Sequence, residues 1–306
     1  MQLLHRLTVP AWAAVIVLLA ACGSTATSSP PTGTAASPLS RPAVLPTIVS
    51  SELGVGHNRV VFSFLDSTGT KPIAAPDRTA KVRFEGPKGE KVAAPDGTFV
   101  WAIENVSGVY VTSADFPTVG SWTAVFTTAA PGSPESTVGF AFDVAAKVDV
   151  VHPGDEAPSV ATPTLKDVGG NIAAVSTDAK PDKAFYETSV ADALAAHKPF
   201  VLIFATPKFC RTATCGPTLD KIKTVAAAHP GVTFINVEPY QLALSNGQLQ
   251  PVFDANGGLQ TVPASDAYRL RSEPYVFVVN KNGVVTASFE LIFSPDEINA
   301  AVSALG

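Results

Sequence analysis

The sequence predicts a multidomain protein in which an all-β sandwich is followed by an α/β domain. Between residues 47 and 151, short strands separated by turns recur without a convincing helix. After residue 152, apolar strands alternate with amphipathic helices, which is typical of sheets that contain parallel strands. The length of 306 residues suits two such domains plus tails.

The composition favours packed cores and argues against a nucleic-acid surface. Hydrophobic residues make up 46% of the chain and charged residues 15%, which is unlike a disordered protein. The formal net charge is -5 and no basic cluster interrupts it, so we expect no nucleic-acid partner. The five histidines are scattered, with no pair at the spacing of a helical metal site, so we assign no cofactor or metal site.

Residues 1–21 have the pattern of a secretory signal peptide. His5 and Arg6 form a short basic region, and the apolar stretch over residues 11–20 is too short for a bilayer span. The stretch ends in Leu19-Ala-Ala-Cys22-Gly, which resembles the bacterial lipobox. This resemblance implies cleavage before Cys22, lipid on its sulfur, and an extracytoplasmic protein anchored to the lipid bilayer of the bacterial cell membrane. The alternative is an ordinary signal peptide with an incidental cysteine.

Residues 22–46 are rich in Ser, Thr, Pro and Ala, carry almost no charge and show no periodicity. This composition is typical of a tether, so we expect it to hold the folded domains away from the membrane.

The sandwich is expected over residues 47–151, with strands at residues 59–65, 80–85, 108–113, 120–127 and 138–144. The pattern Gly108-x-Tyr110, Phe116, Gly120-x-Trp122 resembles immunoglobulin-like modules found on bacterial surface proteins. Together with Trp101, its aromatic residues would form either a ligand cleft or, as is far more common, the core between the two sheets.

Two of the three cysteines lie between a strand and a helix of the second domain, residues 152–306. An apolar run over residues 200–206 predicts a central strand, and Leu219, Ile222 and Val225 recur at helical spacing. We therefore expect Cys215 at the N-terminus of the helix, where free N–H groups and the helix dipole stabilise a thiolate. Cys210 lies five residues upstream, close enough to close a small disulfide loop.

This strand, loop and helix, with Cys215-Gly216-Pro217 at the junction, resembles the active site of the thioredoxin superfamily. The stretch from Ser272 through Pro274 to Gly283 resembles the cis-proline strand and hairpin of that family, and residues 154–158 resemble the opening of its membrane-anchored, extracytoplasmic members. The resemblance covers about residues 154–306. It implies a thioredoxin-like domain.

The resemblance also implies an activity, which is thiol-disulfide exchange with the thiols or disulfides of exported proteins. In this interpretation Cys215 reacts with the partner, Cys210 resolves the mixed disulfide, and a cis Pro274 positions the partner chain. With Cys22 lipidated, Cys210 and Cys215 remain as one pair in an oxidising compartment.

Three positions depart from the family pattern. Thr218 stands where a second cysteine is usual, Thr214 where an aromatic residue is usual, and Leu202 where a buried carboxylate often accepts a proton. These departures leave two alternatives open. One is a non-enzymatic envelope lipoprotein with a structural disulfide. The other rests on a further resemblance, since the Cys-x4-Cys pair is similar to that of the copper-handling assembly proteins of this superfamily. It implies a protein that binds Cu(I) through two thiolates and a third ligand, which could only be His57 or His152.

The remaining elements follow local signals. We expect a short helix over residues 242–253, a strand over residues 275–280 and a hairpin turn at Asn282-Gly283. Ser294-Pro-Asp-Glu297 predicts a capping box at the start of the last helix.

Overall fold

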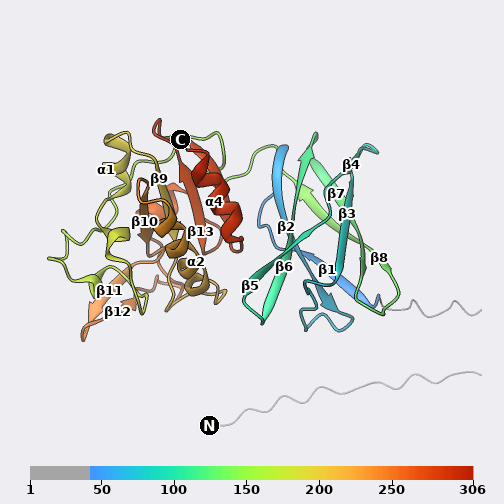
Figure 1. The fold of residues 1–306 in the computed structure, drawn as a ribbon, viewed down its shortest axis with the longest axis horizontal. Helices are drawn as coiled ribbons and strands as arrows, with labels where there is room; N and C mark the ends of the chain where they lie inside the picture. The colour runs from blue at the N-terminus through green and yellow to red at the C-terminus, as the bar shows by residue number, and fades with distance from the viewer. Residues whose placement is uncertain (1–41, 306) are drawn as a thin grey trace, which may run out of the picture. The chain divides into compact units, whose positions relative to one another are not determined.

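A computed structural model describes residues 42–305 (Figure 1). The predicted signal peptide, the predicted lipidation site Cys22 and most of the predicted tether lie outside the described residues. Within residues 42–305, no helix has the length and apolar character needed to cross a membrane. Strand pairing divides this range in two, because β1 to β8 and β9 to β14 form separate sheets.

The first part is all-β and consists of two four-stranded antiparallel sheets, ordered β1-β2-β6-β5 and β4-β3-β7-β8 (Figure 1). The five strands predicted from the sequence are all present. The structure adds β1, β4 and β5. The bounds are β1 (Val44–Ile48), β2 (Gly56–Asp66), β3 (Thr79–Glu85), β4 (Lys91–Ala93), β5 (Thr98–Ile103), β6 (Ser107–Phe116), β7 (Gly120–Ala129) and β8 (Ser136–Val144).

The aromatic residues between these sheets form a core. Tyr110 and Trp122 are each 1% exposed, and the Tyr110 hydroxyl donates a hydrogen bond to the carbonyl of Ala75 at 2.8 Å. Burial of this kind requires such a partner for the polar end of the ring. The core interpretation is therefore confirmed for Tyr110 and Trp122. Trp101 is only partly buried and packs edge-on against Phe99, with 4.8 Å between the ring centroids.

The predicted tether ends earlier than expected, because residues 44–46 belong to β1. Pro46 lies within this strand and pairs in register with Phe64 of β2. Proline is tolerated there because β1 is the outermost strand of its sheet, so the missing N–H faces no neighbour. The local composition, which is rich in proline, had favoured a tether up to residue 46.

The second part is built on a four-stranded mixed sheet ordered β10-β9-β13-β14. Strand β9 (Phe200–Phe204) runs parallel to β10 (Thr233–Val237) and antiparallel to β13 (Tyr275–Val279), which pairs in turn with β14 (Val285–Glu290). All five residues of β9 and of β13 are buried. The apolar run in the sequence therefore reflects a strand covered on both faces.

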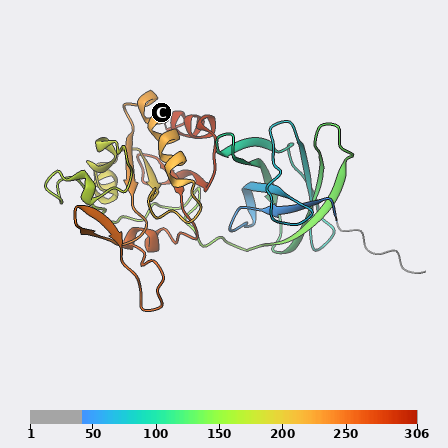
Figure 2. The ribbon, with the colours of Figure 1, turned by 90° about the horizontal axis from the view of Figure 1, so that it is seen from below.

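Helices cover both faces of this sheet. α2 (Cys215–Ala228) and α4 (Pro295–Ser303) lie side by side on one face (Figure 1 and Figure 2). They share a core with alternate residues of β9 and β13, including Val201 and Val276. α1 (Val190–Ala195) and α3 (Pro263–Ala267) lie on the other face of the sheet. They pack against the remaining alternate residues of β9 and β13, including Leu202 and Phe277. Two short 3-10 helices, η1 (Ile172–Ala174) and η2 (Lys183–Tyr186), precede α1.

The ends of the longer helices follow the sequence signals. The Ser294 side chain accepts a hydrogen bond from the Glu297 N–H at 3.2 Å, and the Glu297 carboxylate accepts one from the Ser294 N–H at 2.9 Å. This is the predicted capping box. His229 closes α2, as the following proline and glycine predict.

The predicted helix over residues 242–253 is wrong. The segment forms a hairpin of β11 (Leu242–Ser245) and β12 (Gln248–Pro251). Asn246 and Gly247 have φ values of 51° and 75°, which is the left-handed pair that a tight two-residue hairpin turn requires. The Asn-Gly pair in the sequence was the available signal for this turn.

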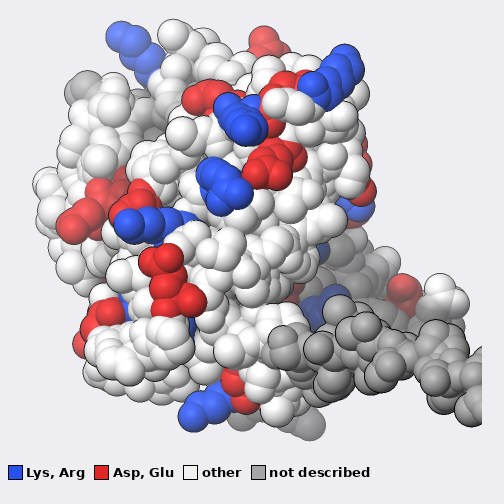
Figure 3. All heavy atoms as spheres, turned by 90° about the vertical axis from the view of Figure 1, so that its right-hand side faces the viewer, with Lys and Arg blue, Asp and Glu red and all other residues white. Residues whose placement is uncertain are grey.

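Charged side chains are dispersed on the face drawn in Figure 3, where Lys and Arg alternate with Asp and Glu among mostly uncharged residues. This agrees with the low charged fraction of the chain.

Replacing Phe277 tests the buried centre of the mixed sheet. Phe277 is fully buried and stacks on Tyr275, with 4.8 Å between ring centroids. Because truncation leaves a cavity, we expect Phe277→Ala to lower the free energy of unfolding by about 3–5 kcal/mol, measured by denaturant titration followed by circular dichroism. Phe253→Ala is the matched control, since Phe253 is 57% exposed and should cost less than about 0.5 kcal/mol. Equal losses for the two variants would contradict the assigned core.

Candidate functional site

The two predicted cysteines meet in a loop between β9 and α2. Cys210 and Cys215 form a disulfide, with 6.0 Å between their Cα atoms, and Cys215 is the first residue of α2. The predicted disulfide and the predicted position of Cys215 are both confirmed. The sulfurs therefore lie at the N-terminus of a 14-residue helix.

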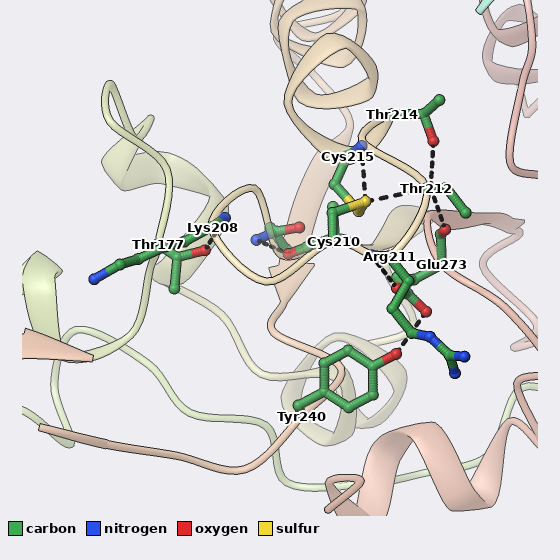
Figure 4. Close-up of a disulfide and its surroundings, with 11 residues drawn as sticks. Thr177, Lys208, Cys210, Arg211, Thr212, Thr214, Cys215, Tyr240 and Glu273 are labelled. Atoms are coloured by element: carbon green, nitrogen blue, oxygen red, sulfur yellow. Dashed lines mark hydrogen bonds between the residues drawn. A yellow bond between two sulfur atoms is a disulfide. The ribbon is translucent and has the colours of Figure 1, made fainter. Parts of the chain in front are cut away.

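The two sulfurs have different environments (Figure 4). Cys215 is fully buried, whereas Cys210 is partly exposed. The Cys210 Sγ accepts a hydrogen bond from the Cys215 N–H at 3.2 Å, and the Thr212 hydroxyl lies 3.3 Å from the same sulfur. The sulfur that a partner can reach is thus also the one that receives the helix N-terminal N–H group.

A buried carboxylate, Glu273, holds the cysteine loop in place (Figure 4). Its Oε1 accepts a hydrogen bond from the Arg211 N–H at 2.9 Å, and its Oε2 accepts one from the Tyr240 hydroxyl at 2.6 Å. The Thr212 hydroxyl donates to the Glu273 carbonyl at 3.0 Å. Burial and the nearby carboxylate both raise the pKa of Tyr240, so the phenol keeps its proton and remains a donor.

Neither Glu273 nor Tyr240 was predicted from the sequence to have a role at the site. Glu273 was visible as an acidic residue directly before the predicted cis-proline. Its partners, however, lie 62 and 33 residues away along the chain. No local pattern connects such positions.

Pro274 follows this carboxylate, and the Glu273–Pro274 peptide bond is cis, as predicted. Tyr275, the next residue, pairs with Phe204 at the end of β9 from which the cysteine loop departs. Pro274 is buried, and its carbonyl accepts a hydrogen bond from the Leu291 N–H at 2.8 Å. The Pro274 carbonyl is therefore already paired within the domain.

The three positions that depart from the thioredoxin pattern are all buried. Leu202 belongs to the core beneath α1 and α3, on the opposite side of the sheet from Cys215. The Thr218 N–H donates to the Thr214 carbonyl at 2.8 Å, and the Thr214 hydroxyl lies 2.8 Å from the Thr212 hydroxyl. At position 214, where the thioredoxin pattern has an aromatic residue, the start of α2 therefore carries a threonine hydroxyl next to that of Thr212.

Two cationic residues flank Cys210 in the sequence. Lys208 and Arg211 lie two residues before and one residue after Cys210, and both are exposed. The Lys208 ammonium donates a hydrogen bond to the Gln248 side-chain oxygen at 3.1 Å. Both charged groups point away from the Cys210 sulfur, and that of Arg211 lies towards Glu273 and Tyr240 (Figure 4).

A second buried polar group lies at the carboxyl ends of the parallel strands β9 and β10. Glu238 accepts a hydrogen bond from the Thr177 N–H at 2.6 Å through Oε1. Burial raises the pKa of Glu238 to about 7, while Thr206 and Thr177 oppose the rise. Glu238 was not predicted from the sequence, because one acidic residue after a strand carries no specific signal.

No group of three or more His, Cys, Asp or Glu side chains in residues 42–305 is arranged to hold a metal ion. The two histidines considered as third ligands for copper each contact an aspartate. His57 Nδ1 lies 3.2 Å from an Asp115 oxygen, and His152 Nδ1 lies 2.6 Å from an Asp155 oxygen.

Comparisons with known proteins add little to this description. No protein-family model matches the chain, and no curated protein matches it. A crystal structure of a DUF4426 family protein from Pseudomonas aeruginosa PAO1 is similar to part of it, at 12% sequence identity and a TM-score of 0.25. That similarity covers 34% of this chain and 91% of the other. We draw no conclusion about fold or function from so low a score.

Removing the Glu273 carboxylate tests how the loop is held. In Glu273→Ala, the Arg211 N–H and the buried Tyr240 hydroxyl lose their acceptor, so we expect a loss of about 2–4 kcal/mol in unfolding free energy. Hydrogen exchange of the Arg211 amide should also accelerate at least tenfold, measured by NMR. Glu187→Ala, at an exposed position of the same domain, is the control. Unchanged exchange at Arg211 would show that Glu273 does not anchor the loop.

The raised pKa of Glu238 predicts a pH-dependent stability. The folded state holds this proton more tightly than the unfolded state, so its contribution is fully present below pH 4.5 and is lost as the pH rises to about 7. Relative to Glu238→Gln, wild type should therefore lose about 3 kcal/mol over this window and change little above it. Denaturant unfolding of both proteins across this pH range measures the difference. A difference that does not vary with pH would contradict the assignment.

Proposed function

We propose that this protein is a membrane-anchored, extracytoplasmic thioredoxin-like protein that exchanges thiols and disulfides through Cys210 and Cys215. One observation carries the proposal. A partly exposed sulfur is bonded to a fully buried sulfur at the first residue of a helix. This arrangement gives an incoming thiolate access to one sulfur and provides a stabilised site for the thiolate that leaves.

The strand order supports the thioredoxin-like assignment. The sheet places the first strand of the domain, β9, between β10 and β13, with the cysteine loop and α2 after β9 and the cis Pro274 before β13. The two facing four-stranded sheets of the first part are compatible with an immunoglobulin-like sandwich. The membrane anchor rests on the lipobox resemblance around Cys22 alone.

The first step of the exchange follows from the exposure of the sulfurs. A partner thiolate attacks the Cys210 Sγ and forms a partner–Cys210 disulfide. The Cys210–Cys215 bond breaks and its electron pair leaves on Cys215 as a thiolate. The dipole of α2, whose first residue is Cys215, stabilises this anion.

The second step completes a two-electron transfer. A second thiolate of the partner attacks its own sulfur in the mixed disulfide, which leaves an oxidised partner and releases Cys210 as a thiolate. The Cys215 N–H and the Thr212 hydroxyl are placed to stabilise that anion. In the opposite direction the reduced pair reduces a partner disulfide, again through Cys210.

This assignment exchanges the roles that the sequence resemblance implied. Cys215 was the expected site of attack and Cys210 the expected resolving residue. Complete burial of Cys215 favours the reverse, because a thiolate must reach the sulfur along the line of the disulfide bond.

A structural disulfide is the second candidate function. The hydrogen bonds from the loop to Glu273 and the burial of Pro274 favour it, because they restrain the loop and cover a surface that a partner would otherwise contact. The reduction potential separates the two functions. Structural disulfides of exported proteins lie below about -300 mV, and exchange proteins between about -270 and -120 mV.

Trapping of mixed disulfides tests the assigned roles. In a Cys22→Ser background, we expect reduced Cys215→Ser to accumulate a disulfide between Cys210 and one half of a disulfide-linked peptide dimer. The other half leaves as a thiol, and the mixed disulfide persists because no Cys215 thiolate remains to resolve it. Cys210→Ser should form at least tenfold less, since its only thiol is buried. Mass spectrometry of alkylated samples measures both. Equal trapping by the two variants would refute the assigned order. If neither variant traps and the potential lies below about -300 mV, the disulfide is structural.

A further inference from the structure

A cavity of about 270 Å³ lies beside β10, between η1 and the β11–β12 hairpin, and has no part in the exchange described above. Its apolar wall comes from Ala174, Val175, Leu242, Leu249 and Val262. An engineered apolar cavity of about 150 Å³ accepts benzene, so this one has room for about ten non-hydrogen atoms. Leu242 is partly exposed, so the cavity can be reached from solvent along the hairpin.

Two polar residues line the same cavity, and each has a buried oxygen without a hydrogen-bond partner among the described residues. These atoms are Asn236 Oδ1 and Glu238 Oε2, in side chains that are 2% and 8% exposed. Leaving such an acceptor buried and unpaired costs about 1–3 kcal/mol, so each calls for a donor.

The orientation of the Asn236 amide is fixed by its neighbours. Its Nδ2 donates to the Tyr186 hydroxyl at 2.9 Å and lies 3.5 Å from the Ala205 carbonyl. Reversing the amide would place an oxygen against that carbonyl, so Oδ1 is the free end. Thr206, next to Ala205, has a buried hydroxyl that makes no hydrogen bond of normal geometry among residues 42–305. It lies near the Glu238 carboxylate as a weak donor and lowers the pKa of that group, so it meets part of the need of Glu238 for donors.

The charge of the site favours a cation. No Lys or Arg is among the described residues that line the cavity. The Asp178 carboxylate adds negative potential at Glu238, although Asp178 also pairs with Lys223 at 2.6 Å. A primary ammonium has three N–H donors and no acceptor, which matches a set of oxygens that need donors.

We propose that this cavity binds a small primary amine, with the ammonium group against Asn236 and Glu238 and the apolar part between η1 and the hairpin. The position agrees with the general rule for α/β sheets, since ligands bind at the carboxyl ends of parallel strands, here β9 and β10. The proposal does not depend on the exchange reaction. The Glu238 carboxylate recognises the charge of the ammonium group, and the apolar wall of the cavity limits the size of the apolar part of the amine.

Calorimetry of the whole chain with 2-phenylethylamine and 2-phenylethanol tests this proposal. The two probes have the same size and differ in charge. We expect saturable binding of the amine at millimolar concentration or below, and binding at least tenfold weaker for the alcohol. Amine affinity should rise between pH 6 and pH 8 as Glu238 ionises, since the probe stays protonated throughout this range.

Three variants locate the site. Glu238→Gln keeps the shape of the side chain and should weaken amine binding at least tenfold, whereas Glu187→Gln, at an exposed position, should leave it unchanged. Ala174→Phe should abolish binding by filling the cavity. Ala174 is partly exposed, so this variant also decides the question if Glu238→Gln does not fold.

Four outcomes would overturn the proposal. These are no saturable binding of the amine, equal affinity for amine and alcohol, full affinity in Ala174→Phe, or full affinity in a folded Glu238→Gln. A Glu238-dependent heat with calcium chloride but none with the amine would likewise overturn it, because the oxygens would then form an inorganic cation site.

Discussion

Burial of β9 and β13 on both faces is the constraint that organises the second domain. Because every residue of these strands is covered, the domain needs one helical layer for each set of alternating side chains. α2 and α4 supply one layer, and α1 and α3 supply the other. The cysteine loop leaves the end of β9, so one end of the loop is fixed by a strand whose residues are all buried. The cysteine loop is held at both ends by regular elements, β9 and α2, which favours a fixed geometry of the site.

Two buried carboxylates near this sheet differ in how completely they are satisfied. Both oxygens of Glu273 accept hydrogen bonds, and the residue joins the cysteine loop to Tyr240. Glu238 has a bond to one oxygen only, and burial raises its pKa towards neutrality. A satisfied buried carboxylate restrains the chain, whereas a half-satisfied one is left able to bind a donor. We interpret the first as structural support for the disulfide and the second as a recognition group.

The asymmetry between the two sulfurs arises from the backbone around them. Starting α2 at Cys215 places its side chain in the core with Leu219 and Ile222. Cys210 then approaches from the loop and meets the first N–H of the helix. The start of α2 therefore buries the Cys215 sulfur and donates a hydrogen bond to the Cys210 sulfur. Cys210 and Cys215 are five residues apart, so one cysteine belongs to the loop and the other to the helix. Two cysteines on one helical turn would both belong to the helix.

The sequence determined the elements that depend on neighbouring residues. The β9 run, the Ser294 capping box, the start of α2 at Cys215 and the disulfide with Cys210 all follow from local spacing and residue type. Tertiary structure decided what depends on residues far apart in the chain. Pro46 joined a strand because β1 is an edge, and the Asn246-Gly247 turn prevailed over a helix because the hairpin packs Leu249 into the domain. Glu273, Tyr240, Asn236 and Glu238 gained their roles only through burial. Burial and long-range hydrogen bonds are properties of the assembled core, so no local pattern could report them.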